Sequence, residues 1–215
     1  MIDLHHFLSN VSTEKIEKLT QLAELFTTWN QKLNLSAIRD QDGVFLKHVL
    51  DSLLILAFHL IEPEQKVLDL GTGGGFPGLA LAIAYPKNTF TLLDATLKKL
   101  KAVKDMAKEL GLSNIQMVHS RAEDVNKTSA FAGKFDRVVA RAVAKFPLLM
   151  EYSMPFLKPG GILIAYQGPE LLDTWRSFQP QANKLNSRIE RVFETVLPIE
   201  NAKRCFVIVK KNPLA

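Results

Sequence analysis

A glycine-dense segment, DLGTGGGFPG at residues 69–78, has the residue types and spacing best suited to chemistry. It follows the apolar residues Val67 and Leu68 and precedes the apolar run at residues 79–84, so it predicts a turn between a strand and a helix. Because glycine has no Cβ, several backbone N–H groups of such a turn can face a polar or anionic cofactor. The segment therefore indicates a cofactor-binding loop.

Two cofactor patterns fit this loop in different registers. Residues 73–78 match the GxGxxG of dinucleotide-binding proteins, and residues 69–75 match the DxGxGxG of S-adenosylmethionine (SAM) methyltransferases. Asp69 favours SAM, because a carboxylate at the strand end suits the cationic amino group of SAM and would repel the pyrophosphate of NAD. Asp69, Gly71 and Gly73 are then expected at the cofactor. A strand-to-helix turn without a ligand remains a third interpretation.

Composition is that of an ordinary globular enzyme. The chain has 215 residues, 47% of them hydrophobic, which is enough for one domain with an extension. The net charge of +5 is compatible with a polyanionic partner and also with none. The single cysteine, Cys205, leaves no internal disulfide and no cysteine metal cluster, so we expect no metal.

Hydropathy predicts a cytoplasmic protein that does not associate with membranes, and we expect a monomer. The longest purely apolar run, residues 53–58, is far shorter than the ~20 residues of a membrane-spanning helix. The first ten residues, MIDLHHFLSN, lack the basic start and apolar stretch of a signal peptide.

The spacing of apolar residues changes near Pro63. Before it, apolar residues from Ile16 to Phe26 recur at helical spacing, and residues 44–60 predict a second helix, so residues 1–62 are expected to form a helical extension. After it, segments alternate in type, which predicts a wound α/β domain over residues 63–215. The expected strands are residues 66–70, 89–94, 115–119, 135–140, 161–167, 189–197 and 204–210, and the expected helices are residues 77–85, 96–110, 146–157 and 170–178.

Polar residues follow these strands at the edge where open α/β sheets bind ligands. Asp94 ends the second strand and can accept hydrogen bonds from both hydroxyls of a ribose, or cap the helix that begins near residue 96. The turn at residues 119–124 can offer backbone and carboxylate groups to an adenine, or be a solvated loop. Arg141, between two alanines, fits a site at the mouth of the sheet and equally a buried ion pair.

Taken together, the motifs resemble those of the bacterial small-subunit ribosomal RNA guanine-N7 methyltransferases, also called glucose-inhibited division protein B, over nearly the full length. The segments that carry the resemblance are DLGTGGGFPG, SRAE at residues 120–123, ARA at residues 140–142, Trp29-Asn30 with Asn34-Leu35-Ser36, and His48-Val49-Leu50-Asp51-Ser52, with Arg204 and Lys210 near the C-terminus. One departure is Gln167-Gly168, where many members have Lys-Gly.

The resemblance implies a class I SAM-dependent methyltransferase fold, Rossmann-like, with a seven-stranded sheet whose last strand is antiparallel and with an N-terminal helical extension. It implies SAM as the cofactor and 16S ribosomal RNA or the small ribosomal subunit as the substrate. Asp94 would bind the ribose hydroxyls. The other implied cofactor contacts are Gly71, Phe76, Ala122, Glu123 and Arg141.

Methylation of guanine N7 needs little catalytic apparatus. N7 of a neutral guanine already has an available lone pair, so no general base is required, and positioning alone can contribute up to ~7–11 kcal/mol. We assign catalytic alignment to Arg141. Candidate contacts to the RNA substrate are Asn30, Asn34, His48, Asp51, Gln167 and Arg204, of which the first four fit helix capping and interhelical hydrogen bonding equally well.

Lysines crowd the helix expected at residues 96–110, opposite its apolar face, and are either an RNA-binding surface or a solvated one. Two functions other than methylation remain open. An NAD(P)-linked oxidoreductase rests on the GxGxxG register alone. A non-catalytic RNA-binding protein with a vestigial SAM fold would retain the loop without the transfer.

Overall fold

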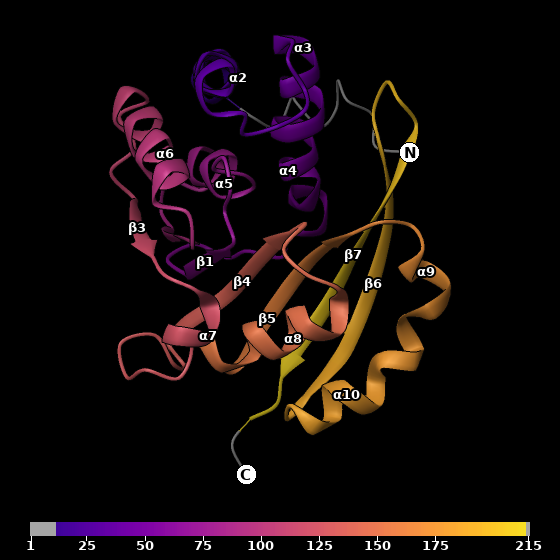
Figure 1. The fold of residues 1–215 in the computed structure, drawn as a ribbon. Helices are drawn as coiled ribbons and strands as arrows, with labels where there is room; N and C mark the ends of the chain where they lie inside the picture. The colour runs from indigo at the N-terminus through magenta and orange to yellow at the C-terminus, as the bar shows by residue number, and fades with distance from the viewer. Residues whose placement is uncertain (1–11, 214–215) are drawn as a thin grey trace.

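Seven strands form one sheet in the computed structural model, which describes residues 12–213 (Figure 1). Their order is β3-β2-β1-β4-β5-β7-β6, and β7 is antiparallel to both of its neighbours while the other pairs are parallel. This confirms the expected class I methyltransferase sheet. The strands are β1 (Lys66–Leu70), β2 (Thr89–Asp94), β3 (Ile115–His119), β4 (Phe135–Arg141), β5 (Leu157–Gln167), β6 (Ser187–Leu197) and β7 (Ala202–Lys211).

The direction of winding changes between β1 and β4. From β1 the chain proceeds outward through β2 to β3, and then returns to β4 on the other side of β1. Such a switch point leaves a crevice beyond the carboxyl ends of the central strands, which is where open α/β sheets bind ligands. The loop after β1 and the residues that end β2 and β4 therefore meet at one edge.

Helices cover both faces of the sheet because its strands are apolar on both sides. On one face α5 (Gly78–Ala84) and α6 (Leu97–Glu109) pack with side chains such as Val67 and Val139. On the other face α8 (Phe146–Ser153) packs with the neighbouring residues Leu68 and Val138. The remaining segments after β3 are α7 (Ala122–Val125), η3 (Met154–Phe156), α9 (Leu171–Thr174), η4 (Trp175–Phe178) and α10 (Gln179–Lys184).

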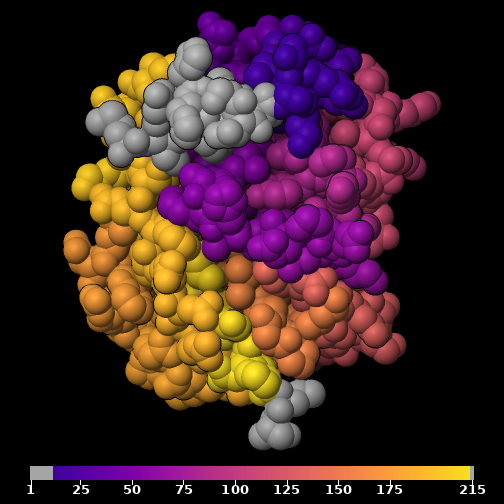
Figure 2. Space-filling model, turned by 180° about the vertical axis from the view of Figure 1, so that it is seen from behind, coloured from indigo at the N-terminus to yellow at the C-terminus, as the bar shows by residue number. Residues whose placement is uncertain are grey.

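The N-terminal helices share the apolar cluster of the first face rather than forming a core of their own. The long helix α2 (Thr13–Leu33) contacts α5 and α6. Seen from behind, the violet segment that follows it lies between the yellow C-terminal strands and the pink region of α6 (Figure 2). None of the helices within residues 12–213 has the length and apolar character of a membrane span.

The helix expected at residues 44–60 is not one regular helix. It is divided into α3 (Gln41–Val44), the π-helix η1 (Phe45–Leu50), α4 (Asp51–Leu53) and the 3-10 helix η2 (Leu54–Phe58). In this stretch the carbonyls of Lys47 and His48 accept hydrogen bonds from the distant side chain of Arg141. A carbonyl that accepts a hydrogen bond from a distant side chain need not accept one from an N–H of its own helix. π-helical turns are frequent at functional sites.

Two other expected boundaries differ. The helix expected at residues 146–157 ends in η3, and β5 begins at Leu157 rather than at residue 161. The helix expected at residues 170–178 is split, and it is followed by α10, whose first turn contains Pro180. Proline has a φ suited to a first helical turn and needs no N–H partner there, which explains a new start at this position.

Candidate active site

A cavity of about 600 Å³ opens at the carboxyl ends of β1, β2 and β4. Its volume is within the range of small-molecule sites. Side chains from both the helical extension and the sheet line it. The expected site residues on its wall are His48, Gly71, Gly73, Phe76, Asp94, Ala122, Glu123 and Arg141.

The loop after β1 requires glycine at specific positions. Gly71 has φ +69°, and a Cβ there would lie 2.7 Å from Cγ2 of Val143. The backbone of the loop is tied to β2, because the N–H of Thr72 donates to the carbonyl of Leu93 at 3.0 Å. The glycines thus keep the backbone close to the cavity, in a conformation that an L-residue rarely adopts.

The carboxylate of Asp69 lies beneath this loop and not on the cavity wall. It is fully buried, and its Oδ2 accepts a hydrogen bond from the N–H of Gly78 at 2.8 Å, at the start of α5. Burial raises its pKa to about 6, against the hydrogen bond from Gly78 and the charge of Arg141. Asp69 therefore holds the loop against α5, and its contact with a cofactor stays a prediction.

Asp94 lies on the cavity wall and also organises the loop. Its Oδ2 accepts from the N–H of Gly73 at 2.8 Å, and its Oδ1 accepts from the N–H of Thr96 at 2.7 Å. A carboxylate oxygen has a second lone pair, so each oxygen can still accept from a ligand hydroxyl. The carboxylate of Asp94 thus provides a hydrogen-bond acceptor at the cavity. It is also hydrogen-bonded to the backbone of the glycine loop and to the backbone at the start of α6.

Residues from three other elements complete the wall. Ala122 and Glu123 begin α7, where a turn had been expected, and Glu123 lies 4.0 Å from Arg121. The ring of Phe76 stacks on His48 with centroids 5.3 Å apart and packs edge-on against Phe26. A flat aromatic surface and a set of polar groups therefore face the same cavity.

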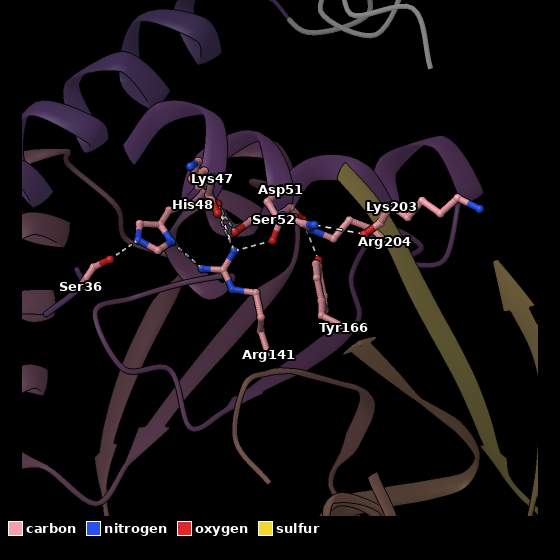
Figure 3. A network of polar contacts seen from close by, with 9 residues as sticks. All are labelled: Ser36, Lys47, His48, Asp51, Ser52, Arg141, Tyr166, Lys203 and Arg204. Carbon is pink, nitrogen blue, oxygen red and sulfur yellow. Dashed lines mark hydrogen bonds and ion pairs between the residues drawn. The ribbon is translucent and has the colours of Figure 1, made fainter. Parts of the chain in front are cut away.

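Arg141 is held by the helical extension at the cavity wall (Figure 3). Its Nη1 lies 2.9 Å from Oδ2 of Asp51. The other oxygen of Asp51 accepts from Nε of Arg204 on β7, at 2.5 Å. Asp51 is 5% exposed, so one buried carboxylate joins two arginines from β4 and β7. Arg141 therefore forms the expected ion pair and also lies on the cavity wall.

His48 is a neutral side chain in this network. Its Nε2 lies 2.8 Å from Oγ of Ser36, and its Nδ1 lies 3.3 Å from Nη2 of Arg141. Burial and the charge of Arg141 lower its pKa to about 4, although Asp51 acts in the opposite direction. Because the guanidinium only donates, Nδ1 is the acceptor and Nε2 carries the hydrogen that is donated to Ser36.

The structure does not bring five of the six expected substrate residues to the cavity wall; Asp51, one of the five, binds Arg141 and Arg204 instead. Asn30 is 1% exposed and bonds the backbone of Ser36 and Ile38, while Asn34 ends α2 with φ +52° and accepts from Arg39. Asn30 and Asn34 therefore have structural roles, which were the alternative to contacts with the substrate. Gln167 pairs with Cys205 in the sheet, and Arg204 reaches Asp51 instead of the cavity.

Sequence patterns did not indicate the contact between Tyr166 and Ser52. The hydroxyl of Tyr166, at the end of β5, donates to the carbonyl of Ser52 at 2.6 Å and is buried. It fastens α4 to the sheet beside Asp51. A tyrosine at the end of an apolar strand carries a hydroxyl that needs a hydrogen-bond partner when it is buried. This requirement is the sequence feature that could have indicated the contact.

The wall suits a nucleoside-containing cofactor. Asp94 provides acceptors for hydroxyls, and Glu123 provides a second carboxylate. Apolar side chains that include Leu93 and Leu148 give a surface for an aromatic base. Cavities that combine apolar side chains with convergent polar groups are typical of cofactor sites.

Comparisons with known proteins agree with this arrangement. Residues 15–201 match the GidB family model, described as rRNA small subunit methyltransferase G. Proteins named ribosomal RNA small subunit methyltransferase G from Thermoanaerobacter sp. (strain X514) and from Deinococcus radiodurans are 39% and 40% identical; each alignment covers 91% of this chain, and 82% and 78% of the relative. The crystal structure of M. jannaschii TYW2 in complex with AdoMet has the same fold, with a TM-score of 0.63 at 14% identity over 83% of this chain and 80% of that one. The chain therefore belongs to the rRNA small subunit methyltransferase G family.

Proposed function

We propose that the protein transfers a methyl group from SAM to N7 of a guanine in 16S ribosomal RNA, in the cytoplasm, where the small ribosomal subunit is found. The proposal rests on the hydrogen bond from the N–H of Gly73 to the carboxylate of Asp94 on the wall of the cavity. An acceptor for ribose hydroxyls beside a glycine loop fits SAM. Membership of the family supports the reaction class and the RNA substrate.

In this proposal Asp94 accepts from the two ribose hydroxyls, and the backbone at Gly71 and Gly73 approaches the methionyl part. Ala122 and Glu123 would receive the adenine. Asp69, buried below the loop, would act on the amino group only through the field of its charge or after a movement of the loop. Phe76 and His48 offer a flat surface to an aromatic base.

N7 of neutral guanine has a free lone pair and no hydrogen, so the protein has no proton to remove there; SAM would supply the electrophilic methyl group on its sulfonium. The purine becomes positive as the methyl group arrives, and nearby cationic charge would oppose this. His48 is neutral at pH 7 because its pKa is about 4, and Asp51 lies 2.9 Å from Arg141. Arg141 can then align the base with its planar donors while its charge is offset.

The oxidoreductase alternative is not favoured, because the family is one of methyltransferases. Titration calorimetry with SAM and with NAD separates the two cofactors. Binding of SAM without methyl transfer to RNA would instead support the non-catalytic alternative.

The deciding experiment maps N7-methylguanosine in 16S ribosomal RNA from cells with and without the gene. We expect one site to lose the modification in the deletion and to regain it when the purified protein and labelled SAM are added to small subunits from those cells. An unchanged methylation map, together with no transfer to those subunits, would contradict the proposal.

A further inference from the structure

The basic residues of the described chain fall into two groups, those that face an acidic partner and those that do not. Arg188, Lys203 and Lys210, on β6 and β7, each lie within 4 Å of a glutamate. By contrast, within residues 12–213 no ion pair involves a lysine of α6. Helix α6 thus carries more cations without an ion pair than any other helix or strand of the described chain.

Helix α6 carries five lysines and two acidic residues, which leaves it a net charge of +3. Lys101, Lys104 and Lys108 are exposed, on the side opposite the buried residues Leu100 and Val103. At 1.5 Å per residue, the row from Lys98 to Lys108 extends over about 15 Å. A continuous cationic row of this length can follow a nucleic-acid backbone.

Some charges on α6 oppose the isolated helix, although Lys108 in its last turn favours it. Lys98 and Lys99 lie in its first turn, which has no acidic residue, where the positive end of the helix dipole disfavours cations. Lys104 and Lys108 are four residues apart on one side, a spacing at which like charges repel. Local choices that oppose the fold are expected at functional surfaces, and a row of lysines is suited to an anion.

The row begins at the cavity. Helix α6 starts just after Asp94, and Lys99 is on the cavity wall with Asp94. Lys145, which precedes α8, is exposed, is likewise without an ion pair in the described chain, and adjoins Ala144 of the wall. Exposed Leu97 and Leu148 flank the same region. An RNA strand with one base in the cavity would thus pass over α6.

We propose that the exposed lysines of α6 bind the phosphates of the RNA strand that leads to the target base. This inference rests on the proposed function for the identity of the nucleic acid. The β6 and β7 surface, where Arg188, Lys203 and Lys210 face glutamates, is then not the RNA-binding face.

The test compares two triple variants that both lower the net charge from +5 to +2. One is Lys101→Gln, Lys104→Gln and Lys108→Gln on α6, which leaves Lys99 at the cavity unchanged. The matched control is Arg188→Gln, Lys203→Gln and Lys210→Gln. Binding is measured over a range of salt concentrations with two probes, 16S ribosomal RNA transcribed in vitro and small subunits from cells that lack the gene.

We expect the α6 variant to lose at least ~tenfold in affinity and to reduce the slope of log K against log salt by about 2, while the control stays near wild type. Equal losses in the two variants, or a wild-type slope in the α6 variant, would overturn the inference, as would a wild-type protein that binds neither probe. SAM affinity, measured separately, should be unchanged in both variants. Because binding is measured without methyl transfer, an inactive protein that shows the expected α6 effect would refute only the proposed function.

Discussion

Asp51 in the helical extension lies 2.9 Å from Arg141 at the end of β4, 90 residues further along the chain. The same carboxylate binds Arg204, so the extension, the centre of the sheet and β7 are joined through one side chain. Only Arg141 of the two arginines reaches the cavity wall. We therefore expect Arg204 to contribute to stability alone and Arg141 to contribute to the reaction as well.

Arg141→Ala and Arg204→Ala should both lower stability, since each removes one charged partner of a buried carboxylate, at a cost of about 1.5–3 kcal/mol. Only Arg141→Ala should slow methyl transfer, at least ~tenfold, which corresponds to about 1.4 kcal/mol. Single-turnover methylation at saturating SAM and RNA, run beside thermal melts, gives both quantities. Arg141→Lys should not restore the full rate, because lysine lacks the planar fork of donors.

A wild-type rate in Arg141→Ala would exclude a role in alignment. If Arg204→Ala also lost activity and RNA affinity, the expectation of a substrate contact at Arg204 would be supported instead.

A second prediction concerns the loop glycine. Gly71→Ala should weaken SAM binding at least ~tenfold, because the new Cβ would lie 2.7 Å from Val143 and shift the loop that faces the cavity. Gly111→Ala is the matched control: it has φ +66°, close to the +69° of Gly71, but nothing within 4 Å of its Cβ.

Both variants carry the backbone cost of a left-handed residue, about 1–2 kcal/mol. Calorimetry should therefore find reduced SAM affinity only in Gly71→Ala, while both melt at lower temperature. Equal SAM affinity in the two variants would show that the loop does not contact the cofactor.

The sheet could be predicted closely because its strands are short apolar runs bounded by polar or turn-forming residues. The bounds of β1, β2 and β3 are those expected from the sequence. Each also ends in or next to a site residue, and the carboxyl ends of adjacent parallel strands must lie together. This is why the sequence alone predicts that Gly71 and Asp94 lie at one cavity.

The helical extension could not be predicted as well, because distant residues determine its form. The carbonyls of Lys47 and His48 accept hydrogen bonds from Arg141, more than 90 residues away. Local periodicity contains no information on such contacts. For the same reason, the structural role of Asn30 and the pairing of Arg204 with Asp51 could not be separated from substrate contacts.

A third prediction concerns Asp94. Asp94→Ala should cost about 1.5–3 kcal/mol of SAM affinity, since it removes a charged acceptor at the cavity. Asp94→Asn should lose less, because one oxygen can still accept from Gly73 or Thr96. Calorimetry with SAM and filter binding with RNA distinguish the effects. A comparable loss of RNA affinity in both variants would point to a folding defect at the start of α6.

The last prediction is a pH dependence of stability that originates at His48. Its pKa is lowered from the usual 6.5 to about 4 in the folded protein, mainly by burial and then by the charge of Arg141. Between these values the unfolded chain binds more protons, so this residue's contribution to stability is complete above about pH 6.5 and is lost as the pH falls toward 4. Asp69 acts in the opposite direction, because its pKa is raised to about 6 and the folded state binds more protons below that value.

The two effects overlap in the wild-type protein, and a variant separates them. His48→Gln cannot titrate but still leaves Asp69 in place, so the difference in unfolding free energy between wild type and His48→Gln reports His48 alone. We expect urea denaturation to give a larger destabilisation by His48→Gln at pH 7 than at pH 5, because wild type has lost part of the neutral-histidine contribution at the lower pH. A difference that is the same at both pH values would show that His48 keeps an ordinary pKa in the folded protein.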